Sequence, residues 1–273
     1  IYNEESSVVE FLKRIYNTTK LLNDKYNFEC IVVDDGSKDN GLVLSKKLVQ
    51  SYDSLKIIEL RRNYGQTAAL QAGIDCAEGE IIITMDADLQ HFPEEIPHFL
   101  QKVSDGYDVV CGWRYNRQED IMRRWPSKAA NFLLRKITKL KINDIGTTYR
   151  AYRRDIIKDV KLLGENHRFI PVFANIAGAK ICEIKIENIE RPHGISNYNI
   201  SRTLNVFIDL FFLFFLVNYL DRPLRIFGKI ALSLIAFAAM ILSFLAYVYV
   251  TTNIPVVREH SGWFALAIMF FVI

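Results

Sequence analysis

The sequence has little excess charge of either sign and lacks several common nucleotide-binding and hydrolase motifs. Its 273 residues carry 34 basic and 31 acidic side chains, a formal net charge of +3. A balance so close to neutral argues against a strongly basic nucleic-acid-binding protein. No Gly-x-Gly-x-x-Gly follows a predicted strand, and no Gly-Lys-Ser/Thr loop, Ser-His-Asp order or His-Glu-x-x-His helix is present. A dehydrogenase or a P-loop enzyme therefore has little support.

Cysteine is also scarce. Cys30, Cys76, Cys111 and Cys182 are scattered, and no pair has the spacing of metal ligands. Cys30 and Cys111 lie in apolar, strand-like segments. The pattern predicts buried free thiols in a reducing compartment. The five histidines are expected to be structural or surface residues.

Charge is distributed unevenly along the chain. Residues 204–273 hold 7 of the 65 charged side chains, whereas the first 203 residues have an ordinary soluble composition. Residues 230–257 contain no charge at all. As a helix, such a segment would be about 42 Å long, which exceeds a bilayer core of about 30 Å. We therefore predict a membrane-spanning helix near residues 228–250.

The regions next to this span predict a membrane-associated tail. The aromatic-rich stretch 204–220 is typical of a helix in the membrane interface. Arg222, Arg225 and Lys229 precede the span, against Arg258 after it, which places the front domain on the cytoplasmic side. Residues 263–273 resemble the start of a second, truncated span. Because a predicted strand motif begins at Ile1, we also expect residues to be missing before it.

The front half alternates predicted strands and helices. Apolar runs at 28–33, 56–60, 80–85 and 107–111 are separated by helical patterns at 38–50, 65–77 and 94–104. A first helix over 8–22 has Asn3 as a candidate cap. This alternation predicts an α/β domain with a mostly parallel sheet covered on both faces. Ligands are then expected beyond the carboxyl ends of the strands.

Two carboxylate clusters fall at such strand ends. Asp86 and Asp88 follow the run 80–85, and Asp34 and Asp35 follow the run 28–33. Carboxylates two residues apart suit a hard cation such as Mg²⁺ or Mn²⁺, which substrate phosphates help to hold. Each cluster alone has a plain alternative, a solvated loop or an Asp-capped turn. Two clusters on neighbouring strands together favour a site for a nucleotide diphosphate.

Ordered motifs add a family resemblance. The chain resembles a family 2 inverting glycosyltransferase of the GT-A fold through Tyr2-Asn3-Glu4-Glu5, Val33-Asp34-Asp35-Gly36-Ser37, Asn63-Tyr64-Gly65-Gln66-Thr67-Ala68-Ala69, Asp86-Ala87-Asp88-Leu89-Gln90 and Gly112-Trp113-Arg114. It is similar to the polyprenyl-phosphate glycosyltransferase branch, which includes dolichyl-phosphate mannosyltransferases and bacterial undecaprenyl-phosphate glucosyltransferases. The motifs of that branch lie at 144–154, 167–171 and 190–198.

The resemblance implies roles for particular residues. The donor nucleotide-sugar would be bound by Tyr2, Glu4, Asp34, Asp35, Asp86 and Ala87. Asp86, Asp88 and Gln90 would hold Mg²⁺ or Mn²⁺ and organise the phosphates. The lipid phosphate or the donor pyrophosphate would meet Arg114, Arg123, Ser127 and Arg191, and Arg150 lies in the acceptor-side motif. One departure is Asn197, which stands where the family usually has a lysine.

The function implied is inverting transfer of a hexose from a UDP- or GDP-sugar to polyprenyl phosphate. UDP-glucose is the preferred donor, with mannose, galactose and an amino-arabinose open. We expect a cytoplasmic catalytic domain at 1–200, a juxtamembrane helix at 201–227 and a transmembrane hairpin at 228–273. Together they predict a multi-pass protein of the bacterial inner membrane. Homo-oligomer formation is left open.

Two alternatives remain at this point. A processive polysaccharide synthase would carry Gln-x-x-Arg-Trp, but Ile121 stands where the glutamine should be. Such enzymes also need more membrane spans than this chain suggests. A non-catalytic scaffold that binds a nucleotide-sugar is disfavoured because Asp86, Asp88 and Gln90 are intact.

Overall fold

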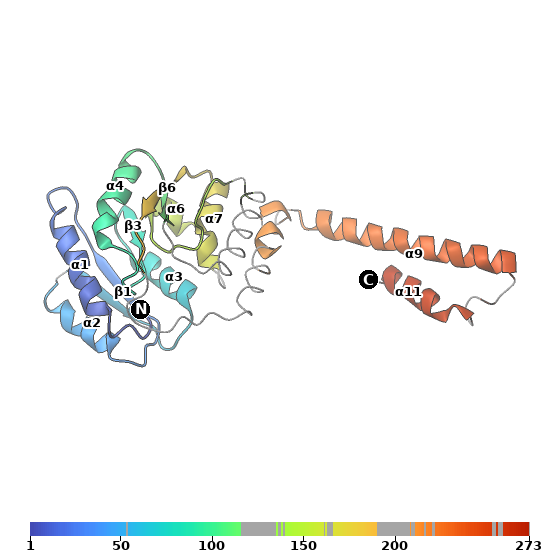
Figure 1. The fold of residues 1–273 in the computed structure, drawn as a ribbon, viewed down its shortest axis with the longest axis horizontal. Helices are drawn as coiled ribbons and strands as arrows, with labels where there is room; N and C mark the ends of the chain where they lie inside the picture. Colours follow the sequence, from blue (N-terminus) through green and yellow to red (C-terminus); the bar gives the residue numbers. More distant parts are fainter. Residues whose placement is uncertain are drawn as a thin grey trace. The chain divides into compact units, whose positions relative to one another are not determined.

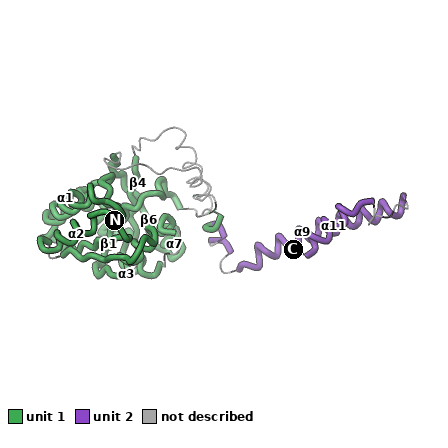
Figure 2. Tube along the Cα trace, turned by 90° about the horizontal axis from the view of Figure 1, so that it is seen from below, with its two compact units in different colours: residues 1–213 green, residues 214–273 purple. Residues whose placement is uncertain are grey.

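The chain forms two compact units, Ile1–Leu213 and Phe214–Ile273 (Figure 2). The computed structural model describes residues 1–52, 54–115, 135, 138, 140–160, 162, 166–189, 208, 211–215, 217–219, 222–252, 255 and 259–272. The predicted three-part division at 200 and 227 stays a prediction.

The first unit alternates strands and helices up to residue 114, as the sequence predicts (Figure 1). In chain order the elements are α1 (Val8–Lys20), β1 (Cys30–Asp34), α2 (Gly41–Val49), β2 (Leu55–Glu59), α3 (Gln66–Cys76), β3 (Ile81–Thr84), η1 (Pro93–Glu95), α4 (Ile96–Ser104) and β4 (Val109–Arg114). They are followed by β5 (Arg150–Arg153), α6 (Arg154–Lys158), η2 (Asn166–Phe169), α7 (Ile170–Ile176) and β6 (Ile181–Ile186). All four predicted strands and the four predicted helices of this part are confirmed.

The strand pairing corrects the prediction of a mostly parallel sheet. Strands β1 and β2 pair in parallel, and a second sheet has the order β3-β5-β4-β6. In it β4 and β6 are parallel, but β5 runs antiparallel to both β3 and β4. The sheets are therefore mixed. Strand β5 escaped prediction because it is only four residues long and has an arginine at each end, so it offers no apolar run.

Among the residues that the structure describes, two apolar clusters connect the helices of the first unit to its strands. Val8 and Leu12 of α1 pack with Val32 of β1 and Leu55 of β2. Because these α1 positions recur at helical spacing, one face of the helix is buried while the other stays polar. The second cluster joins α4 to the second sheet, and the ring of Phe99 stacks on that of Tyr149 at 4.3 Å between centroids. Helices α1 and α4 thus pack against the sheets and hold the strands in position.

Two local predictions need correction. Helix α1 begins at Val8 after Ser7, so Asn3 does not cap it. Asn3 instead has a φ of 55°, and its Oδ1 accepts the N–H of Lys38 at 2.8 Å, which ties the first residues to the loop after β1. Among the thiols, Cys111 is buried, whereas Cys76 is exposed. The prediction of buried thiols is therefore wrong for Cys76, which ends α3 outside the core.

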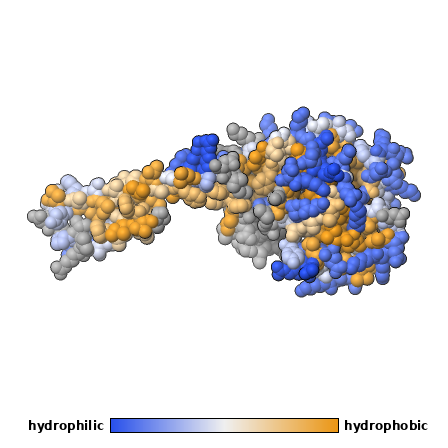
Figure 3. Space-filling model, turned by 180° about the vertical axis from the view of Figure 1, so that it is seen from behind, coloured by the Kyte–Doolittle hydropathy of each residue, from blue (hydrophilic) through white to orange (hydrophobic). Residues whose placement is uncertain are grey.

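The second unit contains α9 (Leu224–Thr252) and α11 (Ser261–Val272). The predicted span 228–250 lies within α9, which is long and apolar enough to cross a membrane. Ile241 and Leu245 of α9 are buried against Ala267 of α11, and the Phe237 and Phe270 rings meet edge to face at 5.5 Å. Apolar residues cover most of the visible surface of these helices (Figure 3).

Candidate functional site

The loop after β3 carries the strongest candidate metal ligands. Asp88 is 9% exposed, and its Oδ1 accepts the N–H of Gln90 at 3.1 Å. Gln66, the first residue of α3, donates from Nε2 to Asp86 Oδ1 at 2.9 Å. Leu89, between Asp88 and Gln90, has a φ of 61°. A bulky side chain rarely adopts this left-handed conformation, and such strain concentrates at functional sites.

The donor set of this loop fits a hard divalent cation. Asp86 and Asp88 offer only oxygen, which suits Mg²⁺ or Mn²⁺ rather than a metal that prefers thiolate or imidazole. Within the described residues, no group of three or more His, Cys, Asp or Glu side chains could hold a metal by itself. Two carboxylates would therefore need oxygens from a substrate to complete the coordination. This is the usual arrangement for Mg²⁺ with nucleotide phosphates.

The loop after β1 is built around two buried carboxylates. Asp35 is 4% exposed and accepts the backbone N–H groups of Tyr64 and Gly65 at 2.7 and 2.9 Å. Asp34 is 1% exposed; its Oδ2 accepts the N–H of Ser37 at 3.0 Å, while Oδ1 is buried with no hydrogen-bond partner among the described atoms. Asp35 therefore fixes the loop after β2. We call Asp34, Asp35, Asp86 and Asp88 the carboxylate edge.

A glycine lets the loop after β1 approach the loop after β2. Gly36 has a φ of 70°, and a Cβ placed on it would lie 2.5 Å from the carbonyl carbon of Arg62. Both the left-handed conformation and the close backbone approach exclude a side chain. The Asp-Asp-Gly order is thus explained by packing in addition to any contact with a ligand.

The remaining predicted donor-side residues are Tyr2, Glu4 and Ala87, and hydrogen bonds from Ile1 to Val33 and from Asn3 to Ser37 hold the first segment beside the loop after β1. Tyr2 is 41% exposed, and Glu4 accepts the hydroxyl of Ser7 at 2.9 Å. Ala87 lies half-buried in the loop after β3. The backbone carbonyl of Gln90 accepts the N–H of Ile189 at 3.2 Å, which brings the segment after β6 to that loop. Their contacts with a donor stay predictions.

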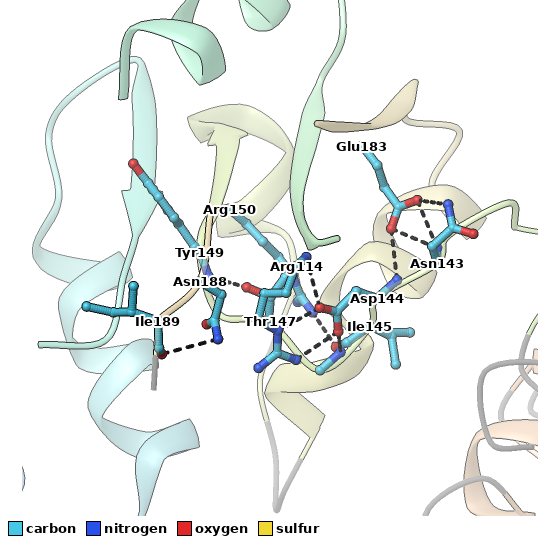
Figure 4. Close-up of polar contacts among 11 residues, drawn as sticks. Arg114, Asn143, Asp144, Ile145, Thr147, Tyr149, Arg150, Glu183, Asn188 and Ile189 are labelled. Atoms are coloured by element: carbon cyan, nitrogen blue, oxygen red, sulfur yellow. Dashed lines mark hydrogen bonds and ion pairs between the residues drawn. The ribbon is translucent and has the colours of Figure 1, made fainter. Parts of the chain in front are cut away.

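Arg114, at the end of β4, is held by Asp144 (Figure 4). Its Nε and Nη2 donate to the two carboxylate oxygens at 2.7 and 2.9 Å, and its backbone N–H contacts Oδ2 at 3.3 Å. Both side chains are about nine-tenths buried. Such a forked pair fixes the plane of the guanidinium. Arg114 is therefore a pre-oriented cation and not a flexible surface arginine.

Glu183 of β6 anchors the loop that supplies Asp144. Its carboxylate accepts the backbone N–H of Asn143 at 2.7 and 2.8 Å and that of Asp144 at 3.0 Å. The side-chain amide of Asn143 donates to it as well, at 2.8 Å. The sequence analysis did not single out this residue. The signal that could have identified it is that Glu183 is the one carboxylate in the short segment 181–186, which also carries Lys185.

Arg150 of β5 lies inside the protein. It is 1% exposed and donates to the carbonyls of Ile145, His167 and Arg168 at 2.6, 3.1 and 3.2 Å. These contacts connect the loop that contains Ile145 to the segment that contains His167 and Arg168. We call Arg114, Asp144, Arg150 and Glu183 the arginine wall.

Three predicted site residues cannot be placed. Arg123, Ser127 and Arg191 lie outside the described residues, as does Asn197. Their assignment to the phosphates stays a prediction. Of the predicted set, the structure brings Asp86, Asp88 and Gln90 together on one loop and places Arg114 and Arg150 in a different group.

The comparison with family models identifies one match. Residues 1–161 match the model described as glycosyl transferase family 2. This segment covers more than half of the chain and includes the carboxylate edge together with Arg114, Asp144 and Arg150 of the arginine wall.

Curated relatives extend the match into the rest of the chain. A dodecaprenyl-phosphate galacturonate synthase of Rhizobium johnstonii is 42% identical over 252 residues, covering 90% of this chain and 74% of the relative. An undecaprenyl-phosphate 4-deoxy-4-formamido-L-arabinose transferase of Pseudomonas syringae is 37% identical over 247 residues, covering 89% and 71%.

Solved structures share the fold. Glucosyl-3-phosphoglycerate synthase from Mycobacterium tuberculosis, in complex with Mg²⁺ and uridine diphosphate, aligns with a TM-score of 0.59 at 15% identity over 77% of this chain and 76% of that chain. The same enzyme with Mn²⁺ and UDP-glucose gives a TM-score of 0.55, covering 76% and 72%. At this identity the likeness concerns the fold alone. Together with the family match, it confirms the predicted GT-A fold.

Proposed function

The chain belongs to glycosyl transferase family 2, and from that premise we propose that it transfers a sugar from a nucleotide-sugar to a polyprenyl phosphate. The observation that carries this proposal is the 42% identity, across 90% of the chain, with a relative named for a dodecaprenyl-phosphate sugar product. The carboxylate edge and the pre-oriented Arg114 agree with it, since the reaction must bring a nucleotide diphosphate and a lipid phosphate together.

The sugar is the finer part of the proposal. Resemblance to bacterial glucosyltransferases favours UDP-glucose, whereas the relatives are named for galacturonate and 4-deoxy-4-formamido-L-arabinose. We propose a UDP-linked sugar and place these three sugars in direct competition as donors. Mannose and galactose are the remaining candidates from the sequence.

Asp86 and Asp88, with Gln90 beside them, would hold the divalent cation. When bound, the ion would neutralise the donor pyrophosphate and stabilise the departing nucleoside diphosphate. The side-chain amide of Gln66 binds Asp86 and the backbone N–H of Gln90 binds Asp88, which holds both carboxylates in place before substrate arrives. Such preorganisation avoids the cost of turning charged groups during the reaction.

The transfer itself forms one bond and breaks one. An oxygen of the lipid phosphate attacks the anomeric carbon, the bond from that carbon to the diphosphate breaks, and the configuration inverts. A phosphate monoester with a second pKa of about 6 is largely ionised at pH 7, so no strong general base is required. Arg114 would hold the attacking phosphate, and Asp144 orients Arg114 through their bidentate pair.

We further propose that the second unit anchors the enzyme in the bilayer as a hairpin of α9 and α11. The buried contacts between Ile241, Leu245 and Ala267 support this pairing. Arg222 and Arg225 precede α9 or lie in its first turn, which favours a cytoplasmic catalytic unit in the bacterial inner membrane. Residues 201–227 would then lie at the membrane interface.

One assay tests the function. Purified protein in detergent is mixed with Mg²⁺, undecaprenyl phosphate and radiolabelled UDP-glucose, UDP-galacturonate or UDP-4-deoxy-4-formamido-L-arabinose. We expect a chloroform-soluble lipid that carries a single sugar, with no such product when the lipid is omitted or EDTA is added. A growing polymer would instead support the processive synthase. No turnover of any donor, including GDP-mannose, would support the non-catalytic scaffold.

A further inference from the structure

The loop that carries Asp144 has its shape imposed from two sides. The residues from Asn143 to Thr147 form neither helix nor strand. Glu183 accepts the N–H groups of Asn143 and Asp144 from one side, while Arg150 donates to the carbonyl of Ile145 from the other. The carboxylate of Glu183 thus binds amide groups of the loop, and the guanidinium of Arg150 binds one of its carbonyls (Figure 4). The loop geometry therefore depends on side chains of β6 and β5.

That geometry determines where the Asp144 carboxylate lies. Its two oxygens must face Nε and Nη2 of Arg114 at 2.7 and 2.9 Å for the forked pair to form. A forked pair is sensitive to direction, because both hydrogen bonds weaken when the carboxylate plane turns. A displaced Asn143–Asp144 backbone would therefore turn the guanidinium away from its present plane.

We propose that Glu183 is a positioning residue that orients Arg114, through Asp144, toward the phosphate of the polyprenyl acceptor. This inference rests on the proposed function for the identity of the phosphate. A carboxylate is required at 183, since it accepts N–H groups on both oxygens. A glutamine keeps one acceptor oxygen, but its NH₂ group cannot accept the second set of N–H donors.

The positioning role of Glu183 can be separated by experiment from a purely structural role in holding β6. Strand β6 is also held by six register pairs with β4, from Val109–Ile181 to Arg114–Ile186, and by the buried side chain of Ile186. The Glu183→Gln exchange preserves volume and leaves those contacts in place. We therefore expect only a small decrease in the unfolding midpoint, from the hydrogen bonds lost at the loop, and an unchanged KM for the nucleotide-sugar. The KM for polyprenyl phosphate should rise about tenfold, because a misplaced binding group loses contact with its substrate.

The kinetic experiment uses the full chain with Glu183→Gln, Glu183→Ala and a matched control. Glu187→Gln makes the same chemical change four residues along, on a side chain that is exposed, and should leave both KM values unchanged. Glu183→Ala should raise the acceptor KM more than Glu183→Gln does. In an Arg114→Lys background, the lysine ammonium cannot form the forked pair with Asp144. There, Glu183→Ala should raise the KM for polyprenyl phosphate by less than about twofold. A full tenfold increase in that background, or an equal rise in the donor KM, would overturn the proposal.

A second readout does not depend on transfer. The Nε–H resonance of Arg114, assigned by its loss in Arg114→Lys, should be sharp and slowly exchanging in the original protein and broadened in Glu183→Ala. Lipid transfer with an unaltered resonance in Glu183→Ala would contradict the positioning role while the function stands. An altered resonance in a protein that transfers no sugar to polyprenyl phosphate would reject the function and the acceptor, and would retain only the connection from Glu183 to Arg114.

Discussion

The carboxylate edge and the arginine wall are held in place by different means. In the carboxylate edge, Asp34 and Asp88 accept backbone N–H groups from residues two or three positions ahead. In the arginine wall, Arg114 and Asp144 are 30 residues apart, and Glu183 lies a further 39 residues along the chain. Asp35 and Asp86 have more distant donors, in Tyr64, Gly65 and Gln66, so the first arrangement is partly local, whereas the second exists only after β4, β5 and β6 have paired.

The difference matches the proposed tasks. Amide donors hold the carboxylates of the edge in fixed orientations, and their oxygen atoms can attract a divalent cation. A guanidinium that is already paired with a carboxylate has its direction fixed, and an incoming phosphate adds negative charge beside it. The carboxylate edge would thus supply charge for the donor, and the arginine wall would supply orientation for the acceptor. The following predictions test whether these two roles can be separated.

The largest effect is expected from Asp88→Ala in the carboxylate edge. Removal of a metal-binding carboxylate should lower the transfer rate by about 1,000-fold or more, because charge on the departing diphosphate is no longer stabilised. The measurement is the rate of lipid-linked product formation, with circular dichroism to show that the fold is retained. Asp105→Asn, on an exposed carboxylate paired with Lys102, is the control and should keep full activity. Retained activity in Asp88→Ala would contradict the metal assignment.

In the arginine wall, Arg150→Met should act on stability. It leaves the carbonyls of Ile145, His167 and Arg168 without their donor in a buried site, at a cost of about 3 kcal/mol in the free energy of unfolding. Urea unfolding of the first unit measures this cost. Arg153→Met, at the other end of β5 with a side chain 49% exposed, should cost less than about 1 kcal/mol. Equal losses in the two variants would show that the three carbonyl contacts contribute little.

The packing of the carboxylate edge is tested by Gly36→Ala. The new Cβ would meet the backbone of Arg62 at 2.5 Å in addition to the strain of a positive φ, so we expect a loss of about 3 kcal/mol. Gly178→Ala is the matched control, since Gly178 has a φ of 90° and nothing within 4 Å of a Cβ. It should lose only about 1 kcal/mol. Equal losses in the free energy of unfolding of the two variants would indicate that the loops after β1 and β2 can separate at little cost.

The smallest effect concerns the reactivity of the thiols in β1 and β4, the strands next to the two regions. Burial raises the pKa of Cys30 in β1 and of Cys111 in β4 to about 12, which leaves about one thiolate in 10,000 thiols at pH 8. Exposed Cys76 should therefore be alkylated first in the folded protein, without loss of activity. Mass spectrometry of the labelled peptides reports the order. If Cys111 were labelled early and Cys30 were not, the sheet that contains β4, next to the arginine wall, would open more readily than the pair of β1 and β2, next to the carboxylate edge.

The carboxylate edge could be predicted from the sequence because the carboxylates of each of its two loops lie within three consecutive residues. Apolar runs ending in Asp34-Asp35 and Asp86-Ala87-Asp88 indicated strands followed by functional loops, and β1 and β3 confirm those strands. The left-handed Leu89 could not be foreseen, since leucine has no preference for that conformation.

The arginine wall could be predicted only in part. Arg114 and Arg150 were identified by their motifs, but neither the pairing of Arg114 with Asp144 nor the burial of Arg150 could be inferred. Both depend on the antiparallel insertion of β5 between β3 and β4, which no apolar pattern announces. Glu183 was missed for the same reason, because its partners lie 39 and 40 residues away.

The polar residues that bound the apolar part of α9 have a consequence for membrane thickness. Between Lys229 and the two polar residues Thr251 and Thr252 at the end of α9 lie 21 residues without charge, about 31 Å of helix. In the proposed orientation this length matches a hydrocarbon layer of about 30 Å with the helix upright. Tilting would adapt it to a thinner bilayer, but no tilt can lengthen it. A thicker, ordered bilayer would have to thin around the helix, so the enzyme should prefer bilayers of ordinary thickness whatever lipid acceptor they contain.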